Sequence, residues 1–318
     1  HLARSGRELH LCAYRASDDL LAFPNVTLHR VPKPLNSYTL GGPLLDRYGR
    51  AVAARIMSRG GRVVVNGGNC LWGDVNWVHH LNVLDTPKPG GGPWRRFKTA
   101  LDYRLYVVAE RKALAAARVL FTTCEKNRED LHRQFGIPLD RVTTIYYGTD
   151  PKVFFPAGSE ERAALRAKLG WPSDRPVYAF VGGLGDRRKG FDTLFEAWRI
   201  LVARPDWNAD LAVVGAGSEL DHWRERASNE GLKERIRFLG FRRDVPDLFR
   251  ASDAHVLPSR YEGYSLVTQE AICCSLPAFV SRVAGIAERY PKPLDDALLI
   301  SDPNDFEALA AQLVSWRD

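Results

Sequence analysis

The chain has 318 residues, of which 45% are hydrophobic and 26% are charged. This composition excludes a largely disordered chain, and the length suits two domains of ordinary size. The net charge of +7 favours an anionic partner, which leaves nucleic acid, a phospholipid surface and a phosphorylated small molecule open. No recognisable nucleic-acid module accompanies the scattered basic residues, which argues against nucleic acid.

The expected compartment follows from two sequence features. No run approaches the roughly 18 apolar residues that span a bilayer, and the first residues are too polar for a secretory signal. We therefore expect a cytoplasmic protein, with peripheral membrane contact left open. The five cysteines show no CxxC or Cys/His spacing, so we expect reduced thiols rather than disulfides or zinc ligands.

Apolar, β-branched runs alternate with helical patterns in the first half of the chain. This alternation predicts repeated βα units and a parallel sheet, the α/β class. The predicted strands are residues 9–14, 26–31, 62–66, 75–79, 119–123 and 142–146. The predicted helices are residues 44–58, 99–117 and 125–135.

Residues 147–158, YGTDPKVFFPAG, contain glycine and proline in a pattern typical of a linker. We place the domain boundary here, which gives domains of residues 1–150 and 151–318. A second set of strands is predicted at residues 177–181, 211–214, 236–239, 254–257, 278–281 and 298–300.

Residues 181–190, VGGLGDRRKG, follow one of these strands and precede a helical pattern. Gly182 and Gly183 allow close backbone approach to a ligand, while Arg188 and Lys189 supply positive charge beside a helix start. The segment is a candidate phosphate-binding loop, and a solvated turn is the alternative. It matches neither the P-loop nor the GxGxxG fingerprint. The later glycine turn, VVGAGS, is interpreted as an ordinary βα turn.

Residues 258–277, PSRYEGYSLVTQEAICCSLP, contain two carboxylates at a turn that leads into a helix. Glu262 lies in the loop after a predicted strand, and Glu270 lies in a predicted helix of residues 269–274. Free backbone N–H groups at a helix start bind phosphate well. The segment therefore predicts a phosphate site flanked by two carboxylates.

Four ordered motifs resemble family 4 of the glycosyltransferases, which are retaining enzymes of the GT-B architecture. The motifs are Gly148, Asp150, Phe154 and Pro156 in the linker, Gly182, Lys189 and Gly190 in the loop, residues 238–240, and the pair Glu262 and Glu270. The resemblance covers nearly the whole chain. It implies two Rossmann-like parallel-sheet domains facing a cleft, with the acceptor on the N-terminal side and a nucleotide sugar on the C-terminal side.

The resemblance also implies a role for each matched residue. Lys189 would bind the donor diphosphate, Glu262 would contact the donor sugar, and Glu270 would hold the ribose hydroxyls. The implied donor-binding residues are Gly182, Gly183, Arg188, Lys189, Tyr264, Ser265, Leu266, Val267 and Glu270. The implied catalytic residues are Glu262, Lys189 and His79.

His79 and His80 end a predicted strand, in DVNWVHHLN. The family often has a histidine there that faces the donor sugar, and His79 aligns better; a core histidine is the alternative. Residues 87–96, PKPGGGPWRR, are predicted to form a mobile loop at the acceptor side, with an uninvolved surface connection as the alternative.

The implied reaction is retaining transfer to an acceptor hydroxyl, with neither metal nor cofactor. No Asp-x-Asp follows a strand, and no His/Asp cluster has ligand spacing. A catalytically silent sugar-nucleotide-binding protein and a nucleotide-sugar epimerase of the same architecture are the alternatives. The donor is left open, and so is the acceptor, which could be a saccharide, a lipid or a small molecule.

Three positions depart from the family pattern. Gly183 stands where the family usually has arginine, and Ser265 and Ser275 stand where it has glycine. We expect both serines to restrict the backbone and to reduce activity or alter donor geometry. Both ends also look incomplete, because the family's first strand and final helix have no counterpart in the sequence.

Overall fold

The computed structural model describes residues 2–85, 92–185 and 187–317. The chain divides into two compact units, His1–Ile145 and Tyr146–Asp318. The division falls before Tyr146 rather than after Asp150, because the N–H of Ile145 still donates to the carbonyl of Thr122 in the first unit, at 2.8 Å.

The N-terminal unit consists of short parallel strands and four helices in the described residues. Its strands are β1 (Leu9–Ala13), β2 (Val26–Arg30), β3 (Val64–Asn66), β4 (Val75–Val78), β5 (Val119–Thr122) and β6 (Val142–Thr144). Its helices are α1 (Asp18–Leu21), α2 (Tyr38–Met57), α3 (Pro93–Ala116) and α4 (Glu125–Phe135). Short 3-10 turns are η1 (Pro34–Asn36), η2 (Gly67–Asn69), η3 (Asn82–Leu84) and η4 (Leu139–Arg141).

These strands form two sheets, a division that the sequence does not predict. β1 pairs with β2, and β3, β4, β5 and β6 follow one another in a second sheet, all in parallel. The core of the unit gathers around Leu114 of α3, Leu120 of β5 and Leu131 of α4, all fully buried. The second sheet is therefore the scaffold that α3 and α4 cover.

Two helices of this unit begin earlier than predicted. α2 starts at Tyr38 although Pro43 lies inside it, because the missing N–H of Pro43 removes only one bond near the helix start. α3 starts at Pro93, which suits a first turn whose N–H groups have no helical partner. Residues 93–96 of the predicted loop are thus helical, and residues 87–91 lie outside the described residues.

The C-terminal unit follows the βα alternation closely. Its strands are β7 (Val177–Val181), β8 (Asp210–Val214), β9 (Ile236–Gly240), β10 (Ala254–Leu257), β11 (Ala278–Ser281) and β12 (Leu299–Ile300). Its helices are α5 (Ser159–Leu169), α6 (Phe191–Val202), α7 (Leu220–Asn229), α8 (Val245–Ala251), α9 (Leu266–Cys273), α10 (Lys292–Leu298) and α11 (Phe306–Arg317), with the 3-10 turn η5 (Gly285–Arg289). None of the described helices of either unit combines the length and the apolar character of a membrane-spanning segment.

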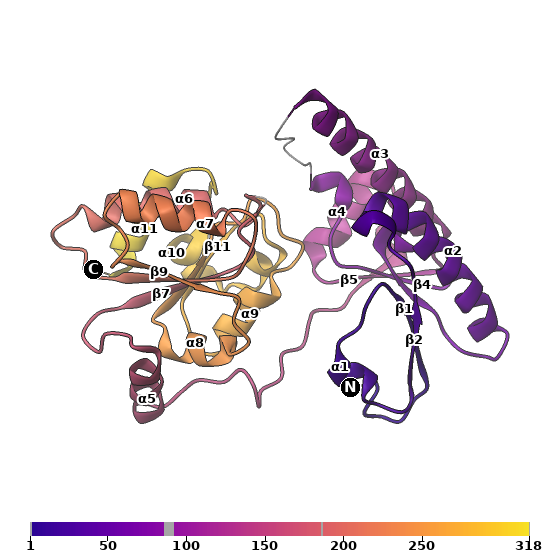
Figure 1. Ribbon diagram of the computed structural model, residues 1–318, viewed down its shortest axis with the longest axis horizontal. Coiled ribbons are helices and arrows are strands. Elements are labelled where there is room, and N and C mark those ends of the chain that lie inside the picture. Colours follow the sequence, from indigo (N-terminus) through magenta and orange to yellow (C-terminus); the bar gives the residue numbers. More distant parts are fainter. Residues whose placement is uncertain (1, 86–91, 186, 318) are drawn as a thin grey trace. The chain divides into compact units, whose positions relative to one another are not determined.

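Helices lie on both faces of its one parallel sheet (Figure 1), and its core fills both sides of that sheet. Alternate residues of a strand point to opposite faces. Tyr178 and Phe180 of β7 pack with α6, α7 and α11, whereas Val177 and Ala179 pack with α5, α8 and α9. Because helices cover both faces, the strands are nearly continuous apolar runs.

Candidate functional site

The strand order of the C-terminal sheet creates a place where two loops diverge. The order is β12-β11-β10-β7-β8-β9, so the chain adds β8 and β9 on one side of β7 and then returns to add β10 on the other. In parallel α/β sheets, the crevice beyond the carboxyl ends of the strands at such a reversal is where ligands bind. The loops after β7 and β10 border this crevice, and they carry most of the residues selected from the sequence.

The loop after β7, which holds Gly182 and Gly183, rests directly on the loop after β8. The N–H of Leu184 donates to the carbonyl of Ala216 at 3.1 Å. A Cβ at Gly215 would collide with the carbonyl of Gly182. The glycines of the second loop therefore permit backbone-to-backbone packing, which fits their interpretation as a turn and holds the first loop in place.

The loops after β7 and β10 are joined at Gly190 and Arg260. Gly190 has φ +70°, and a Cβ there would collide with the carbonyl of Pro258. Arg260 donates two hydrogen bonds to the carboxylate of Asp192, at 2.7 and 2.9 Å, and its N–H donates to the carbonyl of Arg188 at 2.8 Å. This bidentate pair and the backbone bond make the two loops one structural element.

Lys189, Arg188 and Glu262 meet where these loops come together. Lys189 Nζ forms an ion pair with Glu262 Oε2, and Arg188 Nη1 lies 3.5 Å from the same oxygen. The hydroxyl of Ser259 lies 3.4 Å from it. Two cations thus face one carboxylate, an arrangement that an anionic ligand could share.

Helix α9, which follows this loop, begins with N–H groups that donate to no side chain or carbonyl of the described residues and so stay available to a ligand. Its cap residue is Ser265, whose hydroxyl lies 2.8 Å from that of Thr268. In the part of the chain that the structure describes, the N–H groups of Leu266 and Val267 meet no protein acceptor. Tyr264, just before the cap, is buried. Such N–H groups bind phosphate oxygens.

Two serines adopt the left-handed backbone region. Ser265 has φ +86° and Ser275 has φ +61°. Both stand where the resemblance noted above predicts glycine, which adopts this conformation without steric cost. The chain therefore adopts at each serine a turn that suits glycine better, with a strain of roughly 1–2 kcal/mol.

Glu270 lies one turn into α9 and is partly buried. Burial raises the pKa of its carboxyl to about 7. Among the described residues, the carboxylate has neither an ion-pair nor a hydrogen-bond partner. It is therefore able to accept hydrogen bonds from the hydroxyl groups of a ligand.

A histidine in β10 was missed by the sequence analysis. His255 is fully buried; its Nδ1–H donates to the carbonyl of Ala179 at 3.0 Å, and its Nε2 lies 3.5 Å from the hydroxyl of Thr268. Burial lowers the pKa of His255 to about 4, and the charge of Lys189 contributes in the same direction. The neutral ring links β10 to the start of α9. The sequence does contain a feature that could have indicated this histidine, because His255 is the one polar residue in the apolar run 254–257.

Gln269 ties α9 to the beginning of the C-terminal unit, and it too was missed. Its amide donates to the carbonyl of Tyr147 at 3.0 Å and to the hydroxyl of Thr149 at 2.6 Å. Its Oε1 accepts from the hydroxyl of Tyr264 at 2.5 Å, and the ring of Tyr264 packs against that of Tyr147. The segment that follows the unit boundary is thus held by the loop that carries the site.

His79 belongs to the N-terminal unit, where it follows β4 directly; the other predicted site residues all belong to the C-terminal unit. Its ring stacks on Trp77, and its carbonyl accepts from the amide of Asn127 at 3.4 Å. Burial, and then the neighbouring His80, lower the pKa of His79. Its imidazole is therefore neutral at pH 7.

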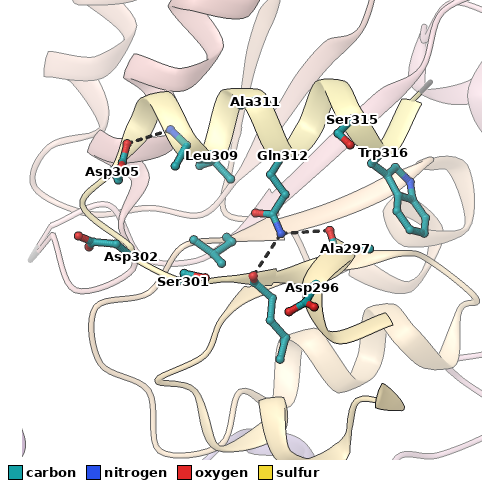
Figure 2. A pocket seen from close by; sticks show the side chains of 13 residues that line it. Asp296, Ala297, Ser301, Asp302, Asp305, Leu309, Ala311, Gln312, Ser315 and Trp316 are labelled. Carbon is teal, nitrogen blue, oxygen red and sulfur yellow. Dashed lines mark hydrogen bonds between the residues drawn. The ribbon is translucent and has the colours of Figure 1, made fainter. Parts of the chain in front are cut away.

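Two further observations concern metals and cavities. No group of three or more His, Cys, Asp or Glu side chains in the described ranges could hold a metal ion, and all five cysteines are free thiols. A cavity of about 500 Å³ lies apart from the crevice, between β12, α10 and α11, where the amide of Gln312 bridges the carbonyls of Ala297 and Leu299 (Figure 2). No residue that lines it is basic, so the crevice suits a phosphorylated ligand better.

Solved structures share this fold. WaaG, a glycosyltransferase involved in lipopolysaccharide biosynthesis, has a TM-score of 0.77 and 22% identity, covering 99% of this chain and 83% of its own. Sucrose-phosphate synthase from Thermosynechococcus elongatus has a TM-score of 0.74 and 22% identity, and the match covers 99% of this chain and 80% of that one. HepE from Anabaena in complex with UDP-glucose has a TM-score of 0.70 and 18% identity, covering 100% and 84%. The chain has the GT-B fold, with two Rossmann-like parallel-sheet domains.

Sequence relatives identify the C-terminal unit. Residues 175–317 match the family described as Glycosyl transferases group 1. O-antigen chain mannosyltransferase B of Escherichia coli is 30% identical over 221 residues, 65% of this chain and 55% of that protein. D-inositol 3-phosphate glycosyltransferase of Xylanimonas cellulosilytica is 31% identical over 226 residues, which are 67% of this chain and 51% of that protein. The chain spans about half the length of these curated relatives. Its C-terminal unit is a glycosyl transferases group 1 domain.

Proposed function

We propose that this chain is a retaining glycosyltransferase that moves a sugar from a nucleotide-diphosphate sugar to an acceptor hydroxyl without a metal ion. The observation that carries the proposal is the cluster of Lys189, Arg188 and Glu262 at the crevice of the C-terminal sheet. The names of the curated relatives, a mannosyltransferase and an inositol 3-phosphate glycosyltransferase, support the same reaction class. The UDP-glucose complex of HepE supports a nucleotide-sugar donor.

The donor diphosphate would be held by positive charge and by backbone N–H groups. Lys189 and Arg188 supply the cations, and Leu266 and Val267 supply N–H groups without protein acceptors among the described residues. Transfer breaks the bond between the anomeric carbon and a diphosphate oxygen, so negative charge grows on the leaving group. Donors fixed at this place stabilise the transition state more than the bound substrate.

The two carboxylates would hold the remainder of the donor. Glu262 restrains Lys189 and would contact the sugar, while Glu270 would accept hydrogen bonds from the ribose hydroxyls. The leaving diphosphate would take the proton of the acceptor hydroxyl, so that the new bond forms on the face from which the diphosphate departs. His79, with its neutral ring, is the N-terminal unit's candidate for a contact with the sugar.

Substitution of the cluster tests the proposal. Lys189→Ala should reduce transfer by roughly 100- to 1,000-fold, by analogy with the loss of one oxyanion donor, and Glu262→Ala should abolish it. Lys233→Ala is the matched control, because Lys233 is an exposed lysine of the same unit with no ion pair in the described residues. Circular dichroism and thermal unfolding check that the variants are folded. Full activity of Lys189→Ala or Glu262→Ala would refute the site.

A donor screen should come first. UDP-, GDP-, ADP- and dTDP-sugars are compared by thermal shift, because a donor at 100 times its dissociation constant stabilises the fold by about 2.7 kcal/mol. Transfer is then measured with the donors that bind. Binding without transfer to any saccharide, lipid or small-molecule acceptor would favour the catalytically silent alternative.

A further inference from the structure

The hydroxyl of Ser265 does not cap helix α9, although serine is among the preferred capping residues. An N-cap serine ordinarily has an extended backbone, and its oxygen accepts from the N–H of the second or third helical residue. Ser265 has φ +86° and ψ +75° instead, and its side chain accepts no such bond. Among the described residues, no side chain or carbonyl accepts the N–H of Val267 or Thr268. The helix therefore starts uncapped, and these N–H groups are left for a ligand.

The hydroxyl of Ser265 belongs to a buried chain of hydrogen bonds that leads away from the crevice. It lies 2.8 Å from the hydroxyl of Thr268, which lies 3.5 Å from Nε2 of His255. Ser265 is 3% exposed, and the other two residues are fully buried. Polar groups that are buried in this way depend on one another for their hydrogen bonds. Strand β10 is thus connected through side chains to the cap position of α9.

The direction of this chain follows from the histidine. Nδ1 of His255 lies 3.0 Å from the carbonyl of Ala179, which can only accept, so Nδ1 carries the proton. Burial lowers the pKa of His255 to about 4, so the ring is neutral at pH 7 and Nε2 is an acceptor. Thr268 therefore donates its only hydroxyl proton to Nε2 and accepts the proton of Ser265. The hydroxyl group of Ser265 is thereby directed into the interior of the unit.

The local preferences of Ser265 oppose this arrangement. Serine is strained in the left-handed region, whereas the extended backbone of an ordinary N-cap is free of that strain. A return to extended backbone would relieve the strain and would let the hydroxyl accept from the N–H of Val267 or Thr268. The cap would then occupy an N–H group that the proposed donor site assigns to the diphosphate. The hydrogen bond to Thr268 is the contact that keeps the hydroxyl from doing so.

We propose that Thr268 and His255 are positioning residues, which hold Ser265 in its left-handed turn and so keep the first N–H groups of α9 free for the donor diphosphate. This inference rests on the proposed function and adds the residues that keep its donor site open. It also explains how serine can stand where the family resemblance predicts glycine. Glycine adopts this turn freely and has no hydroxyl that could cap the helix, whereas serine needs another acceptor for its proton.

Two substitutions release the hydroxyl of Ser265 in different ways. Thr268→Val removes the oxygen that accepts its proton, and His255→Leu removes the acceptor that orients Thr268. Each should weaken the binding of a nucleotide sugar by roughly tenfold or more, since one hydrogen bond to a charged phosphate is lost. Calorimetric titration of the whole chain with UDP-, GDP-, ADP- and dTDP-glucose measures the affinity.

Ser265→Gly should restore the affinity in both variants, because glycine keeps the turn and has no hydroxyl to cap the helix. If Thr268 and His255 only stabilised the fold, a further substitution beside them would leave the loss unchanged or increase it. Thr268→Ser is the matched control, because it keeps the hydroxyl and should bind as the wild-type chain does. Thermal unfolding verifies that each variant is folded.

The outcomes separate this inference from the donor site on which it rests. A wild-type chain that binds one of the four nucleotide sugars, with no loss in Thr268→Val and His255→Leu, would overturn the inference alone. Losses that Ser265→Gly fails to rescue would overturn it as well. A wild-type chain that binds none of the four would refute the donor site, and the inference with it.

Discussion

Replacement of Glu270 by glutamine should remove a pH dependence from donor binding. Burial raises the pKa of this carboxyl to about 7, from 4.5. The ribose hydroxyls would donate hydrogen bonds to it, and an ionised acceptor binds them more strongly than a protonated one. The donor affinity of the wild-type chain should therefore fall as the pH falls through about 7.

The size of the effect follows from the pKa. About nine in ten of the Glu270 carboxyl groups are ionised at pH 8 and about one in ten at pH 6. If only the ionised form holds the ribose, the apparent affinity falls by up to about tenfold over this range, or about 1.4 kcal/mol. Glu270→Gln has the same shape without the charge, so its affinity should be weak and nearly constant.

The same substitution, Glu270→Gln, should weaken donor binding but stabilise the fold. A carboxyl whose pKa is raised on folding contributes stability below its unfolded pKa and loses it as the pH rises through the folded value. Without donor, Glu270→Gln should therefore be more stable than the wild-type chain at pH 8. After allowance for the partial exposure of Glu270, the gain should be about 1 kcal/mol.

Calorimetric titration at pH 6, 7 and 8 measures the affinity, and urea denaturation measures the stability. The probe should be a nucleotide sugar rather than a nucleoside diphosphate, whose terminal phosphate itself titrates near pH 6. A wild-type affinity that is constant from pH 6 to 8 would refute the reasoning about Glu270. An identical pH dependence in Glu270→Gln would refute it equally, since the titrating group would then be another one.

Ser275→Gly should raise the free energy of unfolding by about 1 kcal/mol, because it relieves the φ of +61° and removes only an exposed side chain; urea denaturation measures it. His255 has a folded pKa of about 4, below its unfolded value of 6.5, so its contribution is complete above pH 6.5 and is lost as the pH falls toward 4, by about 3 kcal/mol. His255→Asn should flatten this dependence in denaturation at pH 7 and pH 4.5. Gly190→Ala should cost at least about 3 kcal/mol, because its Cβ would collide with the carbonyl of Pro258. Gly183→Ala should be tolerated in thermal unfolding, because a Cβ there would meet only the carbonyl of Ala216, at 3.9 Å, which is ordinary contact.

Each of these expectations can fail separately. A less stable Ser275→Gly would mean that the left-handed backbone is not strained in serine. A wild-type stability that is equal at pH 7 and pH 4.5 would contradict a neutral, buried His255. Equal losses in Gly190→Ala and Gly183→Ala would show that the collision is not the cause.

The strands of the C-terminal sheet could be predicted because helices cover both of its faces. β7, β10 and β11 have the bounds that their apolar runs predict. In the N-terminal unit the same patterns locate the strands but not their division into two sheets. The pairing of parallel strands depends on how the intervening segments pack, and no local pattern records that.

The order of motifs in the sequence identifies the candidate site residues, but only the structure shows which of them contact one another. Lys189 and Glu262 are 73 positions apart, so no local periodicity connects them. His255 and Gln269 act through hydrogen bonds to other elements, which single-sequence patterns do not contain. The left-handed turn at Ser265 could be inferred, because the resemblance predicts glycine there.

The attachment of Tyr146, the first residue of the C-terminal unit, to a distant part of the same unit sets an order of events during synthesis. The hydroxyl of Tyr146 donates to Glu288 Oε1 at 2.7 Å, across 142 positions of sequence. Ribosomes add about 5–20 residues per second, so roughly 7–30 s separate the appearance of the two partners. The N-terminal unit has its own buried core and can fold during this interval. Tyr146 can acquire this anchor only after the segment that contains Glu288 has been synthesised.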